Sequence, residues 1–335
     1  MAKVATVGIL SIGEMGMGIA KLLIAHNYHV VTNIEGRSED THTRARQSSI
    51  ETLPTDTALV QRADYILSIV PPRDALATAQ RITTAFSSLG PEGKPTPLYY
   101  LDLNAISPRS AREIAAVFHS AAPAIRFLDG GIIGGPPSLA ASATKENTTS
   151  NHPETTHPWK RPSIHVSGSH PLSSAPIAGA NLEEVLNSKH ISAEIGPASG
   201  LKCCFASTSK GFTAICIQAF TTAAQLGVLE ELKEEISTRA PGLFKAGTNG
   251  VTSMPPKAYR WVREMQEIAV THADDGGFEG EGMGIFDAVA RVYDTVANET
   301  VLGEEKTERR KRGRTVEDVA AAMGEGLAAK KMKKE

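Results

Sequence analysis

The chain has 335 residues, and its 35 Lys and Arg against 37 Asp and Glu give a formal net charge of −2. A near-neutral chain lacks the positive excess that binding to a phosphate backbone requires, which argues against a general nucleic-acid-binding protein. Hydrophobic residues make up 41% of the chain, enough to exclude wholesale disorder. With only three cysteines and no apolar run of about 20 residues, the sequence favours a protein of the reducing cytoplasm over a membrane protein.

Short apolar runs alternate with helix-like segments over the first 130 residues. The runs predicted as buried strands are 4–9, 29–33, 65–70, 99–102 and 125–129. The segments predicted as helices are 14–26, 39–50, 73–87 and 107–119. Strands that are regularly separated by helices are most simply joined by crossovers. The alternation therefore predicts an α/β doubly wound fold, with a parallel sheet covered on both faces.

Residues 138–162 interrupt this alternation. They are small, polar and proline-rich, so they cannot bury enough surface to offset chain entropy, and we expect a flexible surface insertion. Its histidines, His152 and His157, lack further ligands at metal-binding spacing, so no metal site is predicted. The sheet is then expected to resume with a strand at 163–167, a helix near 172–187 and a strand near 190–195.

Apolar residues recur at helical spacing over long segments of the second half of the chain, which predicts an all-α domain. Its predicted helices are 199–228, 256–272, 284–299 and 319–329. We expect the sheet domain to cover residues 1–195 and the helical domain residues 196–335. The basic run at 306–314 is interpreted as a solvated linker rather than a nucleic-acid-binding patch. Thr315 then resembles a helix start, with Asp318 at the N3 position of a capping box.

A glycine-rich turn follows the first predicted strand. Gly13 has no side chain, which lets a pyrophosphate approach the backbone, and the helix start offers unpaired N–H donors to its oxygens. Gly16 permits close packing of the helix on the strand, and Ser11 stands where the first glycine of G-x-G-x-x-G usually sits. The turn predicts a dinucleotide site. The residues expected to line it are Ser11, Ile12, Gly13, Glu14, Met15 and Gly16.

The residues after the second strand bear on the choice between NAD(H) and NADP(H). Glu35 offers an acceptor for a free ribose 2′-OH, whereas Arg37 and Ser38 offer donors to a 2′-phosphate. Asn33, at the strand end, is also expected to face the cofactor. We favour NADP(H), with NAD(H) as the alternative.

A proline pair closes the third predicted strand. One interpretation is that Val70, Pro71 and Pro72 form a rigid wall beside the cofactor. The other is an ordinary strand-to-helix turn with proline at the helix start. The sequence leaves both interpretations open.

Three further motifs fall at strand ends or at the domain junction. They are Asp-Leu-Asn-Ala-Ile-Ser-Pro at 102–108, Asp-Gly-Gly-Ile-Ile-Gly-Gly-Pro-Pro at 129–137 and Gly-Pro-Ala-Ser-Gly-Leu-Lys at 196–202. With the glycine turn, they resemble the β-hydroxyacid dehydrogenase family, which includes 3-hydroxyisobutyrate and 6-phosphogluconate dehydrogenases. Residues 205–211 and 259–265 resemble a phosphogluconate-dehydrogenase-type C-terminal domain. The resemblance implies a Rossmann domain, hydride transfer with a nicotinamide cofactor, and a homodimer.

The resemblance also implies a lysine general acid/base, which is Lys202 here. Lys202 is expected near the positive end of a long apolar helix, and both the helix end and burial lower the pKa of a lysine. The alternative is a lysine that reaches from the helix end to solvent. The family usually has an asparagine four residues later, where this chain has Ala206, and Ser209 on the same face partly replaces it. Lys210 lies about 80° round the helix and is treated as secondary.

The expected substrate site departs from the family pattern. Relatives hold a substrate carboxylate with Ser-Gly-Gly, whereas this chain has Ile133, Gly134 and Gly135. Because isoleucine donates no hydrogen bond, a bulkier or less polar small molecule is favoured over a small carboxylate. Asn104 matches a position near nicotinamide and substrate, although capping of the helix near 107 is an equal alternative.

These observations favour an NAD(P)-dependent oxidoreductase that acts on an alcohol/carbonyl pair. Imine reductases share the architecture but often replace the lysine, so Lys202 favours carbonyl chemistry. Because Ala206 and Ile133 remove polar contacts, a catalytically inactive NAD(P)-binding regulatory module is the alternative from another functional class.

Overall fold

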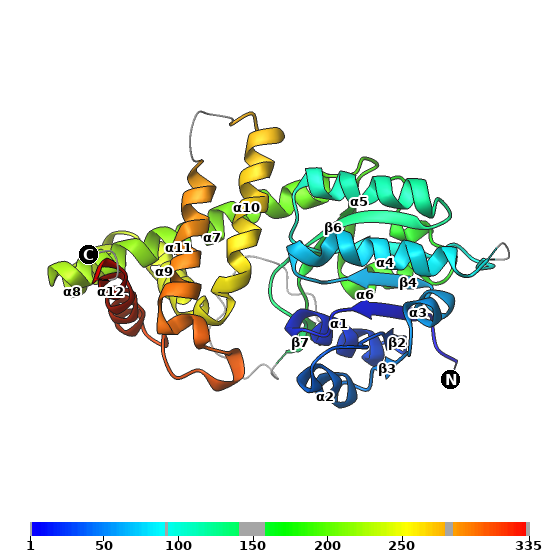
Figure 1. Ribbon diagram of the computed structural model, residues 1–335, viewed down its shortest axis with the longest axis horizontal. Helices are drawn as coiled ribbons and strands as arrows, with labels where there is room; N and C mark the ends of the chain where they lie inside the picture. The colour runs from blue at the N-terminus through cyan, green and yellow to red at the C-terminus, as the bar shows by residue number, and fades with distance from the viewer. Residues whose placement is uncertain (1, 91–92, 141–157, 279–283, 333–335) are drawn as a thin grey trace. The chain divides into compact units, whose positions relative to one another are not determined.

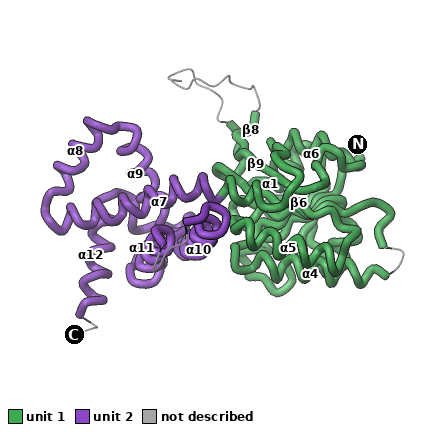
Figure 2. The backbone as a smooth tube through the Cα atoms, turned by 90° about the horizontal axis from the view of Figure 1, so that it is seen from above, with its two compact units in different colours: residues 1–202 green, residues 203–335 purple. Residues whose placement is uncertain are grey.

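The computed structural model describes residues 2–90, 93–140, 158–278 and 284–332. The chain divides into two compact units, residues 1–202 and residues 203–335 (Figure 2). Helix α7 (Pro197–Leu226) begins in the first unit and continues into the second. Among the described residues, no helix combines the length and the apolar character that crossing a membrane requires.

One eight-stranded sheet forms the centre of the first unit, with the strand order β10-β9-β6-β5-β4-β1-β2-β3. Its strands are β1 (Thr6–Leu10), β2 (His29–Thr32), β3 (Glu51–Thr52), β4 (Tyr65–Ser68), β5 (Tyr99–Asp102), β6 (Arg126–Ile133), β9 (Ser163–Ser167) and β10 (Ser188–Ser192). The α/β doubly wound fold is confirmed. The β1, β2, β4 and β5 predictions agree with the structure to within two residues at each end.

Helices cover both faces of this sheet (Figure 1). Apolar residues of α1 (Glu14–Ala25), α2 (Glu39–Gln47) and α6 (Gly179–Leu186) pack in one cluster of buried side chains. Those of α3 (Asp56–Arg62), α4 (Ala75–Ser87) and α5 (Pro108–Ala121) pack in a second cluster. Alternate strand residues point into the two clusters, as expected for a sheet buried on both sides.

The sheet departs from a purely parallel pattern where β9 joins β6. Gly130 pairs with Val166 in an antiparallel register, and β10 runs parallel to β9. After β6, the chain passes through β7 (Ser138–Leu139) and β8 (Trp159–Lys160), which pair antiparallel with each other. The antiparallel pairing of β7 with β8 reverses the direction of the chain, and the returning strand β9 runs antiparallel to β6. The predicted insertion falls largely on residues 141–157, outside the described residues.

Four elements of the first unit differ from the sequence prediction. Helix α3 and strand β3 are too short to give a periodic pattern, and both are missed. The helix predicted at 172–187 is divided into η2 (Leu172–Ser174) and α6. Pro176 lies between the two pieces, where a proline cannot supply the backbone N–H of a continuous helix. The strand predicted at 190–195 begins two residues earlier, at Ser188.

The second unit is all-helical and has a core of its own. Beyond α7, its α-helices are α8 (Leu229–Arg239), α9 (Pro241–Ser253), α10 (Ala258–Asp274), α11 (Ile285–Glu299) and α12 (Val316–Met332). Short 3₁₀ turns are η1 (Pro72–Asp74) in the first unit and η3 (Pro255–Lys257), η4 (Val301–Glu304) and η5 (Thr307–Arg309) in the second. Gly227 ends α7 in the left-handed conformation that favours glycine, with φ 75°. Helices α8 and α9 are missed because they bury few side chains.

The basic run is bound to the second unit rather than fully solvated. Arg310 donates to the carbonyl oxygen of Thr252 at 2.6 Å, and Arg312 pairs with Asp318 at 2.6 Å. The predicted capping box forms in part: the Thr315 hydroxyl accepts the N–H of Asp318 at 3.2 Å. The Asp318 carboxylate accepts the N–H of Gly313. The interpretation as a solvated linker is therefore wrong for Arg310 and Arg312, which find acceptors within this unit, whereas Lys306, Arg309, Lys311 and Arg314 are exposed.

Candidate functional site

The glycine turn leaves the start of α1 open. Ser11 follows β1 in the left-handed conformation, with φ 81°, so a serine adopts the strained backbone that glycine usually supplies. A Cβ atom on Gly16 would lie 2.2 Å from the carbonyl oxygen of Ser11, and the turn therefore requires glycine there. Gly13 is the residue before α1, and a Cβ on it would meet no atom within 4 Å. This open space at a helix N-terminus fits a pyrophosphate.

A cavity of about 120 Å³ adjoins this turn. It brings together six predicted cofactor residues: Ser11, Ile12, Gly13, Asn33, Arg37 and Val70. Thr41, Arg44 and Arg81 also line it, and none of the three was predicted from the sequence. Its lining contains three arginines and no carboxylate, and Glu35 is not part of it. The charge of this lining suits an anionic group such as a phosphate.

The remaining predicted cofactor residues do not line this cavity. They are Glu14, Met15, Gly16, Ser38, Pro71 and Pro72. Ser38 directly precedes α2, and its hydroxyl lies 3.2 Å from that of Thr41. Pro72 begins η1 in a turn closed by Asp74 N–H to Pro71 carbonyl at 2.9 Å. The proline pair therefore forms the strand-to-helix turn that was one of the two interpretations.

Asn104 ties the ends of two neighbouring strands together. It is buried, its side-chain oxygen accepts the N–H of Val70 at 2.7 Å, and its amide nitrogen donates to the Ser68 hydroxyl at 3.1 Å. The predicted alternative, a cap for the following helix, is wrong, because Ser107 accepts the N–H of Ser110 at 3.2 Å in that role. Asn104 thus fixes Val70, which lines the cavity.

Asp102 is a fully buried carboxyl group at the end of β5. One oxygen accepts the N–H of Asn104 at 3.0 Å, and the other has no hydrogen-bond partner among the described residues. Burial raises the pKa of Asp102 to about 7, against the lowering effect of the Asn104 N–H. Burial therefore favours the protonated form of Asp102 more than it would be favoured for an exposed aspartate.

Asp129 anchors the start of α7 on the sheet. Its carboxylate accepts the N–H groups of Gly196 at 3.0 Å and Ser199 at 3.1 Å. The hydroxyl groups of Ser199 and Ser167 donate to the same carboxylate. A buried acid at a helix N-terminus satisfies N–H groups that the helix leaves unpaired and favours its positive end. The contact links residues 70 positions apart in sequence, and it fixes the helix that carries Lys202.

The stem of Lys202 packs directly on β6. A Cβ on Gly131 would lie 2.7 Å from the Cβ of Lys202 and 3.1 Å from the carbonyl oxygen of Ala198. Gly131 therefore allows the first turns of α7 to approach the sheet closely. Lys202 itself is half-buried. The first unit alone thus fixes the backbone of the predicted catalytic lysine by two independent contacts, at Asp129 and at Gly131.

The predicted substrate residues lie in both units. Ile133 ends β6 and is half-buried, and Gly134 and Gly135 follow it in exposed positions. Gly134 has φ 122°, a conformation that requires glycine. In the second unit Ala206 is buried, whereas Ser209 is exposed and its hydroxyl lies 3.3 Å from the carbonyl oxygen of Phe205.

Lys210 serves the packing of the second unit. Its ammonium group forms an ion pair with Glu264 and lies 5.0 Å from the centre of the Trp261 ring. The Tyr293 hydroxyl donates to the carbonyl oxygen of Lys210 at 2.5 Å. The motif at 259–265 thus joins α10 to α7. These contacts agree with the secondary role expected for Lys210.

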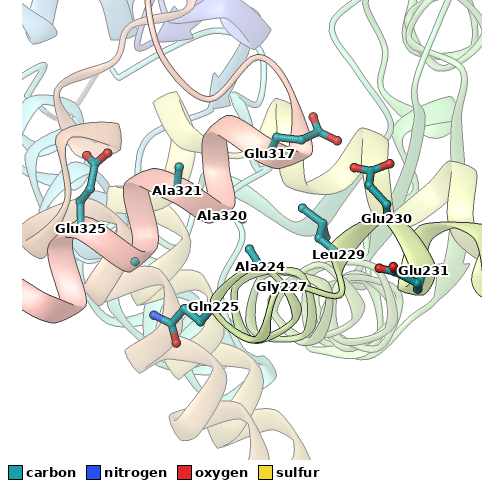
Figure 3. Close-up of a pocket in the computed structure, with 11 residues that line it drawn as sticks. Ala224, Gln225, Gly227, Leu229, Glu230, Glu231, Glu317, Ala320, Ala321 and Glu325 are labelled. Carbon is teal, nitrogen blue, oxygen red and sulfur yellow. The ribbon is translucent and has the colours of Figure 1, made fainter.

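A cavity of about 730 Å³ in the second unit is less suited to a dinucleotide (Figure 3). It lies between the end of α7, the start of α8, and α12. Its walls include apolar Ala224, Leu229 and Ala320, and four carboxylates surround them: Glu230, Glu231, Glu317 and Glu325. This lining has four carboxylates and no basic residue, whereas the cavity beside the glycine turn has three arginines and no carboxylate, so the latter suits a pyrophosphate better.

Two protein-family models match the chain. Residues 5–145 match the NAD binding domain of 6-phosphogluconate dehydrogenase, and residues 223–296 match a domain of unknown function (DUF1932). The first unit thus carries an NAD-binding domain of the 6-phosphogluconate dehydrogenase type. Comparison with curated protein sequences gives no match.

Several solved structures share the fold. The Mycobacterium tuberculosis 3-hydroxyisobutyrate dehydrogenase, solved with L-serine, is 15% identical with a TM-score of 0.61, covering 95% of this chain and 98% of that chain. An imine reductase variant from Myxococcus stipitatus with NAD⁺ is 17% identical with a TM-score of 0.51, covering 96% and 99%. Psf3 in complex with NADP⁺ and 2-OPP is 17% identical with a TM-score of 0.56, covering 86% and 93%. The predicted resemblance is confirmed in the fold and in the type of NAD-binding domain.

Proposed function

We propose that the protein is an NAD(P)-dependent oxidoreductase acting on an alcohol/carbonyl pair. The observation that carries this proposal is the open N-terminus of α1 at Gly13, next to an arginine-lined cavity in a domain of the NAD-binding type. The N–H groups at the start of α1 would hold the pyrophosphate, and Asn33 would lie at the adenosine ribose. When bound, the nicotinamide ring gives or accepts a hydride.

Lys202 is proposed as the general acid/base. It would donate a proton to the carbonyl oxygen during reduction and remove one from the hydroxyl group during oxidation. A general acid must be held within hydrogen-bond reach of its substrate, and the contacts of α7 with Asp129 and of Lys202 with Gly131 supply that rigidity. We assign Asn104 a positioning role, because its amide oxygen is already occupied by the Val70 N–H.

NADP(H) is the proposed cofactor. The residue after β2 is Asn33, which cannot act as the acidic acceptor that a free ribose 2′-OH prefers. Arg37 lines the cavity and Glu35 does not. A guanidinium group beside the ribose favours the 2′-phosphate of NADP(H).

The proposed substrate is less polar than a small hydroxy acid. Ile133 and Ala206 stand where donors would bind a carboxylate and a hydroxyl group, and neither side chain donates a hydrogen bond. An aldehyde or ketone without a neighbouring carboxylate would leave no charged group unpaired at these positions.

The substrate class is tested with a panel of aldehydes, ketones, keto acids and cyclic imines, following the absorbance of NADPH. We expect turnover of uncharged aldehydes or ketones and at least about 10-fold lower kcat/KM for keto acids, since an unpaired charge costs about 1.4 kcal/mol or more. Turnover of cyclic imines alone would assign the protein to the imine reductase alternative. Cofactor binding without turnover of any compound would favour the inactive binding module.

We also propose a homodimer formed through the helical unit. Large apolar side chains of this unit are exposed, including Ile215 at 61%, Leu226 at 72% and Leu243 at 54%. Pairing of two copies would remove this surface from water. Light scattering at micromolar concentration should give twice the mass of one chain, and a monomeric mass would contradict the proposal.

A further inference from the structure

Arg44 connects helix α2 to the glycine turn. It is half-buried, its Nε donates to the carbonyl oxygen of Ile12 at 2.9 Å, and its Nη2 donates to the Thr41 hydroxyl at 3.1 Å. Ile12 lies 32 residues earlier, between Ser11 and Gly13. A guanidinium group has five N–H donors in a fixed plane, so these two bonds orient Arg44 and leave three donors unused. Because Arg44 also lines the cavity, those donors lie beside the space proposed for the cofactor.

The three arginines of the cavity differ in whether an acidic side chain of the protein balances their charge. Asp56 binds Arg81 with two hydrogen bonds of 2.9 Å, so the charge of Arg81 is balanced within the protein. Within the described part of the chain, neither Arg37 nor Arg44 forms an ion pair. The cavity therefore presents two positive charges without an acidic partner. Arg37 is exposed and Arg44 is half-buried, so Arg44 gains more from a bound anion.

An anion that balances Arg37 and Arg44 together needs about two negative charges. A phosphomonoester carries about −1.5 to −2 charges at pH 7, which matches two guanidinium groups. A pyrophosphate bound at the N–H groups of α1 needs neither arginine. Asn33, which follows β2, also lines the cavity, and the ribose 2′ position of a dinucleotide lies at this strand end in doubly wound folds.

We infer that Arg44 is a specificity-determining residue for a 2′-phosphorylated dinucleotide. Arg44 binds the 2′-phosphate together with Arg37, while its bond to Ile12 links that phosphate to the conformation of the glycine turn. Arg81, already balanced by Asp56, contributes less. This inference rests on the proposed dinucleotide-binding function and adds to it the residue that distinguishes NADPH from NADH.

The test measures the dissociation constants of NADPH and NADH by fluorescence titration for the wild type, Arg44→Met and Arg44→Lys. Arg44→Met should weaken NADPH binding about 10–100-fold and NADH binding less than about 3-fold, as expected for one lost charge-assisted hydrogen-bonding group. Arg44→Lys should fall between the two, because a lysine keeps the charge but not the planar fork that reaches both Ile12 and the phosphate. In the same variants, 2′,5′-ADP should compete less well with NADPH than it does in the wild type. Competition by 5′-AMP, which lacks the 2′-phosphate, should not change.

Arg46→Met is the matched control. Arg46 lies on the same helix, has a side chain that is 63% exposed, and pairs with Glu39 outside the cavity. It should leave both dissociation constants unchanged. Equal loss of NADPH and NADH in Arg44→Met would make Arg44 a support for the turn only, and no loss of either would also overturn the inference. Failure of the wild type to bind either dinucleotide would instead overturn the proposed function itself.

Discussion

Replacing Lys202 by methionine is expected to lower kcat for the carbonyl substrate about 10²–10⁴-fold, the usual contribution of a general acid/base. Methionine keeps an unbranched apolar stem that packs on Gly131, so the position of α7 should not change. The loss should therefore appear in the proton-transfer step, with the NADPH dissociation constant altered less than about 3-fold. Stopped-flow oxidation of NADPH together with a fluorescence titration measures both quantities.

Two controls separate this chemical role from a structural one. Lys189→Met changes an exposed lysine on β10 of the same unit and should leave kcat unchanged. The pH profile of kcat should lose the limb that reports the lysine in the wild type, whereas a misplaced helix would lower kcat at every pH. Turnover by Lys202→Met at the wild-type rate would remove Lys202 from the mechanism.

Local patterns predicted much of the first unit. The apolar runs at β4 and β5 are buried on both sides of a parallel sheet, which gives them a continuous hydrophobic sequence that is easily recognised. The glycine turn was also predictable, because the requirements of Gly13 and Gly16 arise within a few residues of the turn itself. In each case the physical cause and the sequence signal lie in the same short segment.

The missed features depend on contacts between distant segments. Arg44 reaches the carbonyl oxygen of Ile12, a backbone group that leaves no trace in the side-chain sequence. The charge of Arg81, unlike that of Arg44, is balanced by Asp56 on another helix, a contact that the sequence does not indicate. The motif at 129–137 was recognised, but the capping of α7 by Asp129 was not, because its donors lie about 70 residues away. Motifs in the sequence therefore predicted the glycine turn and the strand-end residues. They could not predict the hydrogen bonds between distant segments that fix these residues in place.

A dinucleotide is expected to lie against the glycine turn, and Gly13→Val tests this directly. Gly13 has φ −81°, which valine adopts without strain, and its Cβ would enter space that holds no protein atom. The variant should therefore fold with a Tm close to that of the wild type. Its Cβ substituents would occupy the space next to the first N–H groups of α1, where the pyrophosphate is expected to bind.

Gly16→Ala provides the contrast, because its Cβ would lie 2.2 Å from the carbonyl oxygen of Ser11 and should lower the Tm itself. The decisive measurement is the NADPH dissociation constant of Gly13→Val, obtained by fluorescence titration alongside its thermal unfolding. We predict a folded protein whose affinity for NADPH is at least about 100-fold weaker than that of the wild type, a loss of about 2.7 kcal/mol. Unchanged NADPH affinity in folded Gly13→Val would contradict the placement of the cofactor and, with it, the assignment of the active site.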